Sequence, residues 1–451
     1  MGIKVLKFGG TSVANSYAMQ KTFDIVTANN KDKTIVVLSA CSGITDKLIL
    51  LSETCLQKDS NEYQKILTEI ETHHLKLIFE LFWEPEKATS CIKSINFILQ
   101  SLRQLLEGVR ILDELTAKVK AEILSYGEIL STNVFYHYLL FRGVLCFLLD
   151  AREIIETDNF HTNAKPNLPK IEQNREKIFK IFRNYNFIIT QGFIGSWKKE
   201  TTLLGRGGSD FSASLFAYSV DADEVQIWTD VDGIMSADPR LVPSAKPIKT
   251  ITMDEVAELS FFGAKVLHPE TVKPAVIKNI PVKVLNTFNI DSHGTTIVAN
   301  DSLNVSTPTI NSMILLEDCY FLKKSLDLNS KNIVYYISLL NDNFDKLLKI
   351  SFNQNYLYAI ATGEKNPSIG ESSATEVFSV DRVDVLAFFG NNLSKTDSRM
   401  IEMLMKILTK YEHKLFNNFY FTVSDKSILL LAEQGEGKFL LHEFHSTLFE
   451  Q

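Results

Sequence analysis

The chain has 451 residues, of which 45% are apolar and 22% charged, a composition typical of a globular protein with about three domains. Its formal net charge of −7 excludes a general nucleic-acid-binding protein, because no basic excess is present to meet phosphates. No apolar run reaches the ~18 residues of a membrane span, and the first residues have no signal-peptide organisation. The five cysteines are scattered without a C-x-x-C pair. We therefore expect a cytoplasmic protein with free thiols, not disulfides or a zinc site.

The first 46 residues predict alternating strands and helices. A strand is expected at 3–8, a helix at about 15–29 and an almost wholly apolar strand at 34–39, each strand followed by a small-residue or glycine turn. This order is typical of a parallel α/β sheet. Since ligands of such sheets bind beyond the carboxyl ends of the strands, the turns at 7–12 and 39–46 are candidate binding loops.

Lys7 ends the first predicted strand and is followed by Phe8, Gly9 and Gly10. A lysine in this place can set its ammonium beside a phosphate that backbone N–H groups hold. The alternative is a solvated lysine before a tight turn. The chain has no G-x-x-x-x-G-K-[ST], no G-x-G-x-x-G and no H-R-D, so P-loop, Rossmann and protein-kinase folds are not indicated.

Residues 52–142 predict a helical insertion, because apolar residues recur every three or four positions, notably over 60–82 and 86–113. Glu128 lies in the last of these helices among apolar and small residues, and a solvent-facing glutamate is the alternative to a ligand-binding one. Further strands are expected at 143–150, 187–195 and 225–228, with a polar surface segment at 157–185 and a helix at about 253–261.

The loop 205–210 reads Gly-Arg-Gly-Gly-Ser-Asp. Three glycines in four positions suit a backbone that must approach a charged ligand, and the apolar residues that follow have helical spacing. Ser209 or Asp210 is then expected to cap a helix N-terminus, which together with Arg206 makes an anion site. An ordinary glycine-rich turn is the alternative.

Eight blocks resemble, in the same order, those of the aspartate kinases, a branch of the amino acid kinase fold family. They span about residues 1–300 and are Lys7-Phe8-Gly9-Gly10-Thr11-Ser12-Val13, 39–46, Gly127-Glu128, Gln191-Gly192-Phe193, 205–210, Thr229-Asp230-Val231, Ala237-Asp238-Pro239-Arg240 and 262–269. The first and last blocks separate the resemblance from glutamate and acetylglutamate kinases. It implies a three-layer parallel-sheet catalytic domain at 1–300, containing the insertion, and paired C-terminal ACT-like modules at 301–451.

The resemblance also implies transfer of the ATP γ-phosphoryl group to the side-chain carboxylate of L-aspartate, with Mg²⁺ held mostly by phosphates and water and no protein metal cluster. This reaction opens the routes to lysine or diaminopimelate, threonine and methionine. The residues carried over are, for catalysis, Lys7 and Asp210; for aspartate, Ser39, Thr45, Glu128, Phe193, Arg206 and Ser209; and for ATP, Lys7, Phe8, Gly9, Gly10, Thr229, Asp230, Met235, Arg240, Lys265 and Val266.

The chain departs from the family pattern in three places. Met235 stands where the ATP block often has tyrosine, and Asp232 replaces a common proline. Beyond a polar boundary at 300–309, strands are expected at 334–340, 357–361, 383–389 and 427–431 and helices at 342–350, 397–410 and 437–448. The glycine-bearing turn of the family's effector pocket is replaced by Asn341-Asp342-Asn343-Phe344. We expect the modules to form a homodimer or higher homo-oligomer and lysine inhibition to be weak or absent.

Two alternatives remain at this point. One is a kinase of the same fold with another acidic substrate, and the other is a non-catalytic subunit. The joint presence of Lys7, Glu128, Arg206 and Asp210 counts against the second. No dinucleotide fingerprint follows the C-terminal region, so a fused homoserine dehydrogenase is not expected.

Overall fold

The computed structural model describes residues 2–28, 32–56, 60–264, 267–299, 309–326, 333–352, 356–364, 378–393, 406, 408–416, 422–423 and 426–450. Contacts between Cα atoms divide the chain into two compact units. The first consists of Met1–Ile234, Lys249–Met253 and Leu267–Leu303, and the second of Met235–Ile248, Asp254–Val266 and Asn304–Gln451.

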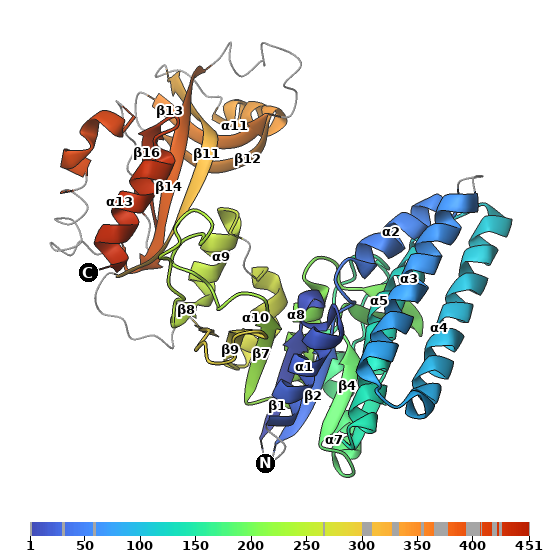
Figure 1. Ribbon diagram of the computed structural model, residues 1–451. Coiled ribbons are helices and arrows are strands. Elements are labelled where there is room, and N and C mark those ends of the chain that lie inside the picture. The colour runs from blue at the N-terminus through green and yellow to red at the C-terminus, as the bar shows by residue number, and fades with distance from the viewer. Residues whose placement is uncertain are drawn as a thin grey trace. The chain divides into compact units, whose positions relative to one another are not determined.

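An eight-stranded sheet forms the centre of the first unit, in the order β3-β4-β2-β1-β7-β9-β10-β8 (Figure 1). The strands from β3 to β9 run parallel, and β10 is antiparallel to β9. Their bounds are β1 (Ile3–Phe8), β2 (Lys33–Leu38), β3 (Cys146–Leu149), β4 (Phe187–Gln191), β7 (Glu224–Thr229), β8 (Thr250–Thr252), β9 (Val282–Asn286) and β10 (Thr295–Val298). The predicted parallel α/β sheet is confirmed.

Helices cover both faces of this sheet, which accounts for its almost continuous apolar strands. Along β1 and β2, Leu6, Phe8, Val36 and Leu38 belong to the core cluster shared with helices α1 (Ser16–Ala28) to α5. Because side chains alternate along a strand, the intervening residues, such as the fully buried Val5, face the other side. There α8 (Gly208–Val220) packs on the sheet, with α6 (Leu168–Gln173), α7 (Arg175–Phe182) and α10 (Pro269–Ile277) beside it.

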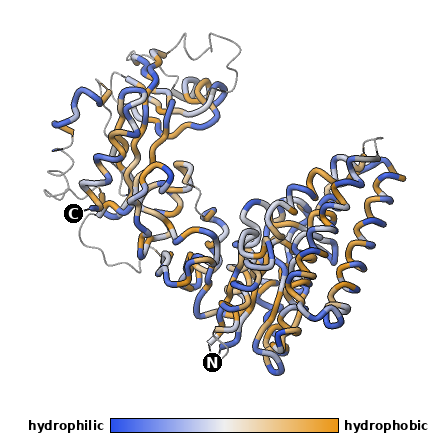
Figure 2. The backbone as a smooth tube through the Cα atoms, viewed as in Figure 1, coloured by the Kyte–Doolittle hydropathy of each residue, from blue (hydrophilic) through white to orange (hydrophobic). Residues whose placement is uncertain are grey.

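Helix α2 (Ile44–Thr54) is followed by the helices expected over 52–142, which are present as α3 (Ser60–Leu81), α4 (Pro85–Leu112) and α5 (Ala117–Phe141). In α4 one residue in each turn is buried, from Cys91 through Ile95 and Leu99 to Leu106, and Figure 2 shows hydrophobic and hydrophilic stretches alternating along this helix. The segment 157–185, expected to be polar and at the surface, contains α6 and α7. Its buried Ile171, Ile178 and Phe182 are enough to attach two short helices to the body.

The second unit contains a six-stranded antiparallel sheet in the order β12-β13-β11-β14-β16-β15. Its strands are β11 (Thr309–Ser325), β12 (Phe344–Phe352), β13 (Tyr356–Glu364), β14 (Ser379–Asn391), β15 (Thr422–Val423) and β16 (Ser427–Glu433). The strands expected at 357–361, 383–389 and 427–431 are therefore confirmed, as is the last helix, α13 (Gly437–Phe449). Most of the expected helix 397–410 and the boundary at 300–308 lie outside the described residues.

Two predictions for the second unit are wrong. Residues expected as a strand at 334–340 form helix α11 (Ile333–Asn343), and those expected as a helix at 342–350 form β12. In α11 the contacts of Tyr336, Leu339 and Leu340 with one core cluster recur at helical spacing, which outweighs the strand propensity of the aromatic and β-branched residues. The β12 residues pair with β13, so tertiary pairing overrides their helical pattern.

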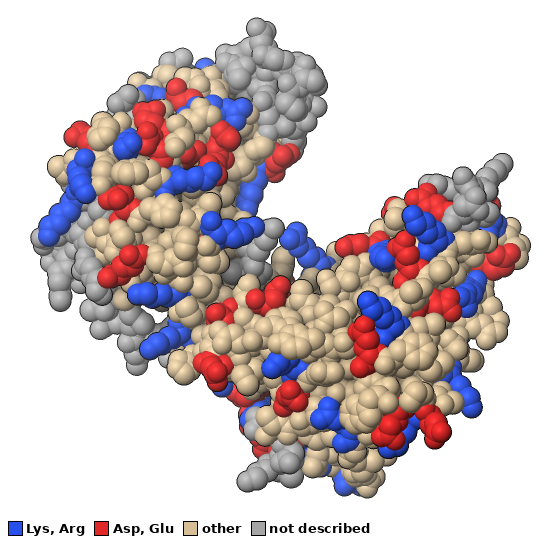
Figure 3. Space-filling model, viewed as in Figure 1, with Lys and Arg blue, Asp and Glu red and all other residues tan. Residues whose placement is uncertain are grey.

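All five cysteines are buried and free, as predicted. Among the described residues, no helix is long and apolar enough to cross a membrane. On the face drawn in Figure 3, Lys and Arg are interspersed with Asp and Glu.

Candidate active site

Four turns meet at the carboxyl ends of the adjacent strands β4, β2, β1 and β7. Backbone hydrogen bonds connect each turn to its neighbouring strand. The N–H of Gly192 donates to Leu38 O (2.8 Å), that of Ser39 to Phe8 O (3.1 Å) and that of Gly9 to Trp228 O (3.0 Å). The turns therefore form one continuous rim, the place where open α/β sheets bind ligands.

Lys7 is the charged side chain at the centre of this rim. It is only 8% exposed, and its Nζ lies 2.7 Å from Oδ1 of Asp210 in the first turn of α8. A lysine so deeply buried needs a paired anion, and Asp210 supplies it from 203 residues away in the chain. The solvated lysine considered from the sequence is therefore excluded.

The glycine loop before α8 has the backbone form that its sequence requires. Gly205 and Gly207 have φ values of 75° and 69°, a left-handed region that favours glycine. Gly207 is the N-cap of α8, with no side-chain capping bond. The expectation that Ser209 or Asp210 caps the helix is thus wrong, because the left-handed turn at Gly207 starts the helix two residues earlier and leaves Asp210 to pair with Lys7.

Two glycines allow the loops of β4 and α8 to touch. A Cβ on Gly192 would lie 2.6 Å from Ser209 Oγ, and a Cβ on Gly208 would lie 2.5 Å from Cδ2 of Phe193. Phe193 itself has a left-handed φ of 66°. The sequence-predicted residues Phe193, Ser209, Asp210 and Lys7 are thus brought together at the rim.

Arg206 lies in the glycine loop at the N-terminus of α8 and is exposed. Within the described part of the chain it has no ion-pair or hydrogen-bond partner. Its guanidinium and the free N–H groups of the helix start can therefore both serve an anionic ligand.

Glu128 approaches the same rim from α5. The helix lies close to the turn after β2, since a Cβ on Gly127 would come within 2.8 Å of Ala40 Cβ. Oε1 of Glu128 accepts a hydrogen bond from Ala40 N (3.1 Å), whereas Oε2 is buried and has no partner among the described residues. Burial raises the pKa of Glu128 to about 8, although the bond from Ala40 opposes this shift. A buried carboxylate oxygen without a donor is suited to a ligand ammonium group, and the solvent-facing alternative is excluded.

This burial predicts how pH affects the ligand-free protein. Between pH 4.5, the ordinary value, and about 8, folded Glu128 keeps a proton that the unfolded chain releases, so the free energy of unfolding contributed by Glu128 falls as pH rises. Glu128→Gln removes the ionisation. We therefore expect its Tm to exceed that of the wild type at pH 8.5, with a difference that shrinks toward pH 5. Calorimetric scans across this range measure it, and a difference that does not change with pH would contradict the assignment.

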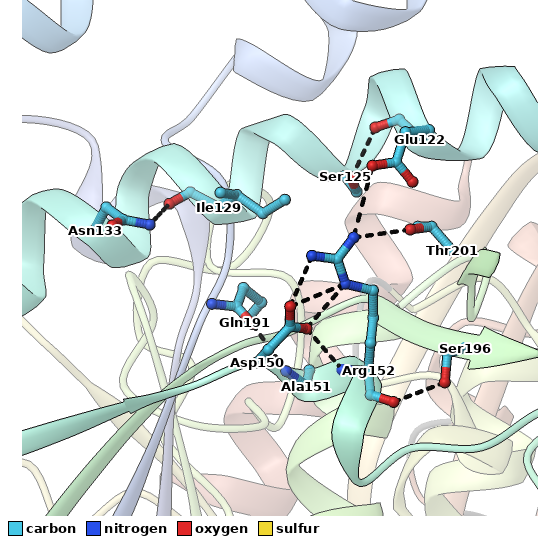
Figure 4. Close-up of polar contacts among 10 residues, drawn as sticks. All are labelled: Glu122, Ser125, Ile129, Asn133, Asp150, Ala151, Arg152, Gln191, Ser196 and Thr201. Carbon is cyan, nitrogen blue, oxygen red and sulfur yellow. Dashed lines mark hydrogen bonds and ion pairs between the residues drawn. The ribbon is translucent and has the colours of Figure 1, made fainter. Parts of the chain in front are cut away.

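A network that the sequence did not predict stands beside the rim, centred on Arg152 in the short helical turn after β3 (Figure 4). Its guanidinium binds Asp150 through Nη2 (2.7 Å), donates to Thr201 Oγ1 (3.0 Å) and lies 3.6 Å from Glu122 Oε1. Its carbonyl accepts from Ser196 Oγ (2.7 Å). The network thereby connects α5, which carries Glu128, to the hairpin of β5 (Ile194–Trp197) and β6 (Glu200–Leu203). Along the chain, this hairpin lies between Phe193 and the glycine loop.

The polar turn 150–152 after a buried strand was the available sequence signal for this network. The position of this turn depends on the pairing of β3 with β4, which places Gln191 Oε1 2.9 Å from Ala151 N. Such pairing cannot be read from the local pattern.

The other predicted residues fall into four groups. Ser39, Thr45, Thr229 and Asp230 lie at strand or helix ends of the first unit, and Thr229 Oγ1 donates to Asp230 Oδ1 (3.1 Å). Phe8 is fully buried and stacks on Trp228, so it can offer a ligand only backbone groups. Met235 and Arg240 belong to the second unit, where Arg240 Nε lies 3.0 Å from Oδ1 of Asp238. Lys265 and Val266 lie outside the described residues.

Asp232, which replaces a common proline, has a structural explanation. Its Oδ1 accepts from Asn286 Nδ2 (2.7 Å) and Asn289 Nδ2 (3.0 Å), and these bonds attach the loop after β7 to the end of β9. No group of three or more His, Cys, Asp or Glu side chains that could hold a metal ion occurs in the described ranges. A Mg²⁺ ion bound mostly by phosphates and water is compatible with this arrangement.

The rim of the parallel sheet carries a paired lysine and aspartate, a glycine loop and a buried carboxylate with one unpaired oxygen. These features define a class of phosphoryl-transfer protein, the amino acid kinase family. The chain belongs to this family, whose profile matches residues 2–286. Its curated relatives include aspartokinases. Lysine-sensitive aspartokinase 3 of Escherichia coli K12 is 31% identical, with 99% of each chain covered. Aspartokinase 1, chloroplastic, of Arabidopsis thaliana is 35% identical over 68% of this chain and 53% of its own length.

Solved structures agree with this membership. The E. coli aspartokinase III complex with lysine and aspartate has a TM-score of 0.81 at 30% identity, covering 99% of both chains. The complex of that enzyme with aspartate and ADP has a TM-score of 0.73 at 29% identity, covering 99% of this chain and 100% of the other. Aspartate kinase of Clostridium acetobutylicum, at 20% identity and a TM-score of 0.82, covering 99% of this chain and 100% of its own, shares the fold.

Proposed function

We infer that the chain is an ATP-dependent aspartate kinase, which transfers the ATP γ-phosphoryl group to the side-chain carboxylate of L-aspartate and forms 4-phospho-L-aspartate. This is the first step of lysine or diaminopimelate, threonine and methionine biosynthesis. The observation that carries the proposal is the buried Lys7–Asp210 pair (2.7 Å) at the same rim as the unpaired carboxylate oxygen of Glu128. One cation is thus available for the transferring phosphate and one anion for an amino acid ammonium.

The proposed roles follow from charge and position. Glu128 receives the substrate ammonium, and Arg206 binds its α-carboxylate. Ser39, Thr45 and Ser209 supply hydrogen bonds to the carboxylates, and Phe193 closes the apolar side. Asp210 orients Lys7. A carboxylate is already ionised at neutral pH, so the attacking group needs no general base and catalysis depends on positioning and electrostatics.

For ATP, we propose that Lys7 and the amides of Gly9 and Gly10 meet the β- and γ-phosphates. Phe8 contributes backbone groups, and Thr229, Asp230, Met235, Arg240, Lys265 and Val266 hold the remainder of the nucleotide. Bound Mg²⁺ would neutralise phosphate charge. We also propose that residues 1–300 form the catalytic domain and 301–451 the ACT-like modules, which assemble the chain into a homodimer or higher homo-oligomer.

Aspartate-dependent hydroxamate formation tests the activity directly, because hydroxylamine traps an acyl phosphate. With ATP and hydroxylamine we expect hydroxamate from L-aspartate, and at most a small yield from L-glutamate or N-acetylglutamate. A preference for either of the latter would assign the chain to another acidic substrate. Absence of hydroxamate from all three would indicate a non-catalytic subunit.

The second unit leads to a prediction about regulation. The E. coli relative is named lysine-sensitive, but here residues 340–343 form the last turn of α11, with Asp342 exposed. Both the carboxylate of Asp342 and the helix C-terminus repel an effector carboxylate. We therefore expect weak or absent inhibition by millimolar lysine, in steady-state assays with lysine and threonine alone and together. Clear sigmoidal inhibition by lysine would contradict this expectation.

A further inference from the structure

The segment 235–248 carries residues assigned to ATP, but it packs with the C-terminal part of the chain. It follows directly on the Thr229-Asp230 loop and contains Met235 and Arg240, both assigned to ATP above. Yet its contacts place it in the second unit, together with the C-terminal strands and α13. The following inference therefore rests on the proposed function.

Ser236 is one of the residues that attach this segment to α13. The segment closes on itself, since Ser236 N donates to Lys246 O (2.8 Å) and Lys246 N donates to Ser236 Oγ (2.9 Å). The hydroxyl of Ser236 then meets Nε2 of His445 at 2.9 Å. The two residues are 2% and 0% exposed, so water cannot replace either partner.

The rest of the contact surface supports the same attachment. Lys246 Nζ donates to Phe449 O (2.9 Å), Ser244 Oγ donates to Glu450 Oε1, and Ala237 and Val242 pack in one core cluster with Leu440, Leu441 and Phe444 of α13. All these partners lie in α13, between Leu440 and Phe449, or directly after it. The segment is therefore held by α13, both by polar groups and by apolar packing.

Counting donors and acceptors gives His445 a specific role. Ser236 Oγ accepts from Lys246 N and forms one further hydrogen bond with His445 Nε2, in which a hydroxyl can donate or accept. The carboxylate of Glu450, whose Oε1 lies 3.4 Å from Nδ1, favours the tautomer with the ring proton on Nδ1, so that Nε2 accepts the Ser236 proton. Burial lowers the pKa of His445, in agreement with a neutral ring. Removing the imidazole leaves a buried hydroxyl proton without an acceptor.

We propose that His445 is a positioning residue for the nucleotide. Through Ser236 it fixes the segment 235–248, and with it Met235 and Arg240, so that losing the His445 contact weakens ATP binding and leaves aspartate binding unchanged. Aspartate is unaffected because Glu128 and Arg206 belong to the first unit.

The test uses the full-length protein and begins with the wild type, by calorimetric titration with ATP and by hydroxamate kinetics. His445→Ala is expected to raise both the Kd and the KM for ATP about tenfold, the effect of one unsatisfied buried group, with the aspartate KM unchanged. His445→Gln, whose Oε1 can accept the Ser236 proton, is expected to retain ATP affinity within about twofold. His442→Ala is the matched control, because His442 is exposed on the same helix and should behave as the wild type.

The outcomes separate the possible explanations. A wild type that binds ATP but forms no aspartyl hydroxamate refutes the proposed substrate and leaves the ATP titrations to decide the role of His445. If His445→Ala does not fold, Ser236→Ala removes the same bond and should show the same selective loss of ATP affinity. A lower Tm with unchanged ATP affinity in the folded variants would make His445 merely structural and overturn the proposal, as would equal losses for ATP and aspartate.

Discussion

Lys7→Ala is expected to lower kcat by about two to three orders of magnitude, the effect of losing one preorganised electrostatic contact in a site shielded from water. The ammonium is held at the end of β1 by Asp210 at 2.7 Å and needs no reorganisation when charge develops on the transferring phosphoryl group. The aspartate KM should change little, because the substrate ammonium and α-carboxylate are assigned to Glu128 and Arg206. Steady-state hydroxamate kinetics at saturating ATP measure both constants.

Lys4→Ala is the matched control for this experiment. Lys4 lies in the same strand, but at its amino end, where it pairs with Asp32 (3.1 Å), and its loss should leave kcat unchanged. A folded Lys7→Ala protein with near-wild-type turnover would remove Lys7 from the catalytic assignment.

Arg206→Ala is expected to raise the aspartate KM roughly 10- to 100-fold, as expected for the loss of hydrogen bonds between charged groups. ATP affinity, measured by calorimetry, should remain nearly intact. Because Arg206 is exposed and has no partner within the described residues, its truncation should also leave the Tm unchanged. Arg175→Ala removes a partly exposed arginine that pairs with Asp221 at the other end of α8 (3.2 Å) and serves as the control.

Glu128→Gln is expected to raise the aspartate KM to a similar extent, because a neutral amide cannot pair with the substrate ammonium. Its effect should depend on pH. In the wild type, aspartate binding requires the ionised carboxyl, so the aspartate KM should fall as pH rises toward about 8, the raised pKa of Glu128. In the variant this dependence should be absent. Equal loss of ATP affinity in either the Arg206 or the Glu128 variant would show that the substrate and nucleotide roles are wrongly divided.

The rim of the site was largely predictable because its parts are encoded locally. An apolar run covered on both faces predicts a parallel strand, and a lysine and two glycines after it predict a turn at the carboxyl end. The loop 205–210 likewise carries its own requirement for left-handed glycines, met at Gly205 and Gly207. Parallel strands bring their carboxyl ends to one edge, which places the turns after β1 and β2 together. The approach of Lys7 to the glycine loop does not follow from this rule, because the loop comes after β6 of the separate two-stranded sheet.

Secondary structure predicted from the sequence pattern was wrong where contacts between distant residues outweigh the local propensity for a helix or a strand. The aromatic and β-branched residues of α11 favour a strand, and only the core contacts of Tyr336, Leu339 and Leu340 make them a helix. Similarly, Asp210 does not cap α8, which begins at the left-handed Gly207, and pairs instead with Lys7, a partner that no local window contains.

The sequence by itself thus determined the α/β class, the order of the binding turns and the charged residues that line them, because these depend on neighbours in the chain. The tertiary structure alone decided which groups are paired. It places Asp210 on Lys7, leaves one oxygen of Glu128 without a donor and attaches Ser236 to His445 across 209 residues. A side chain becomes buried, and its hydrogen bonds are satisfied, only when distant segments of the chain pack together. This packing gives each charged residue of the site its partner and its role.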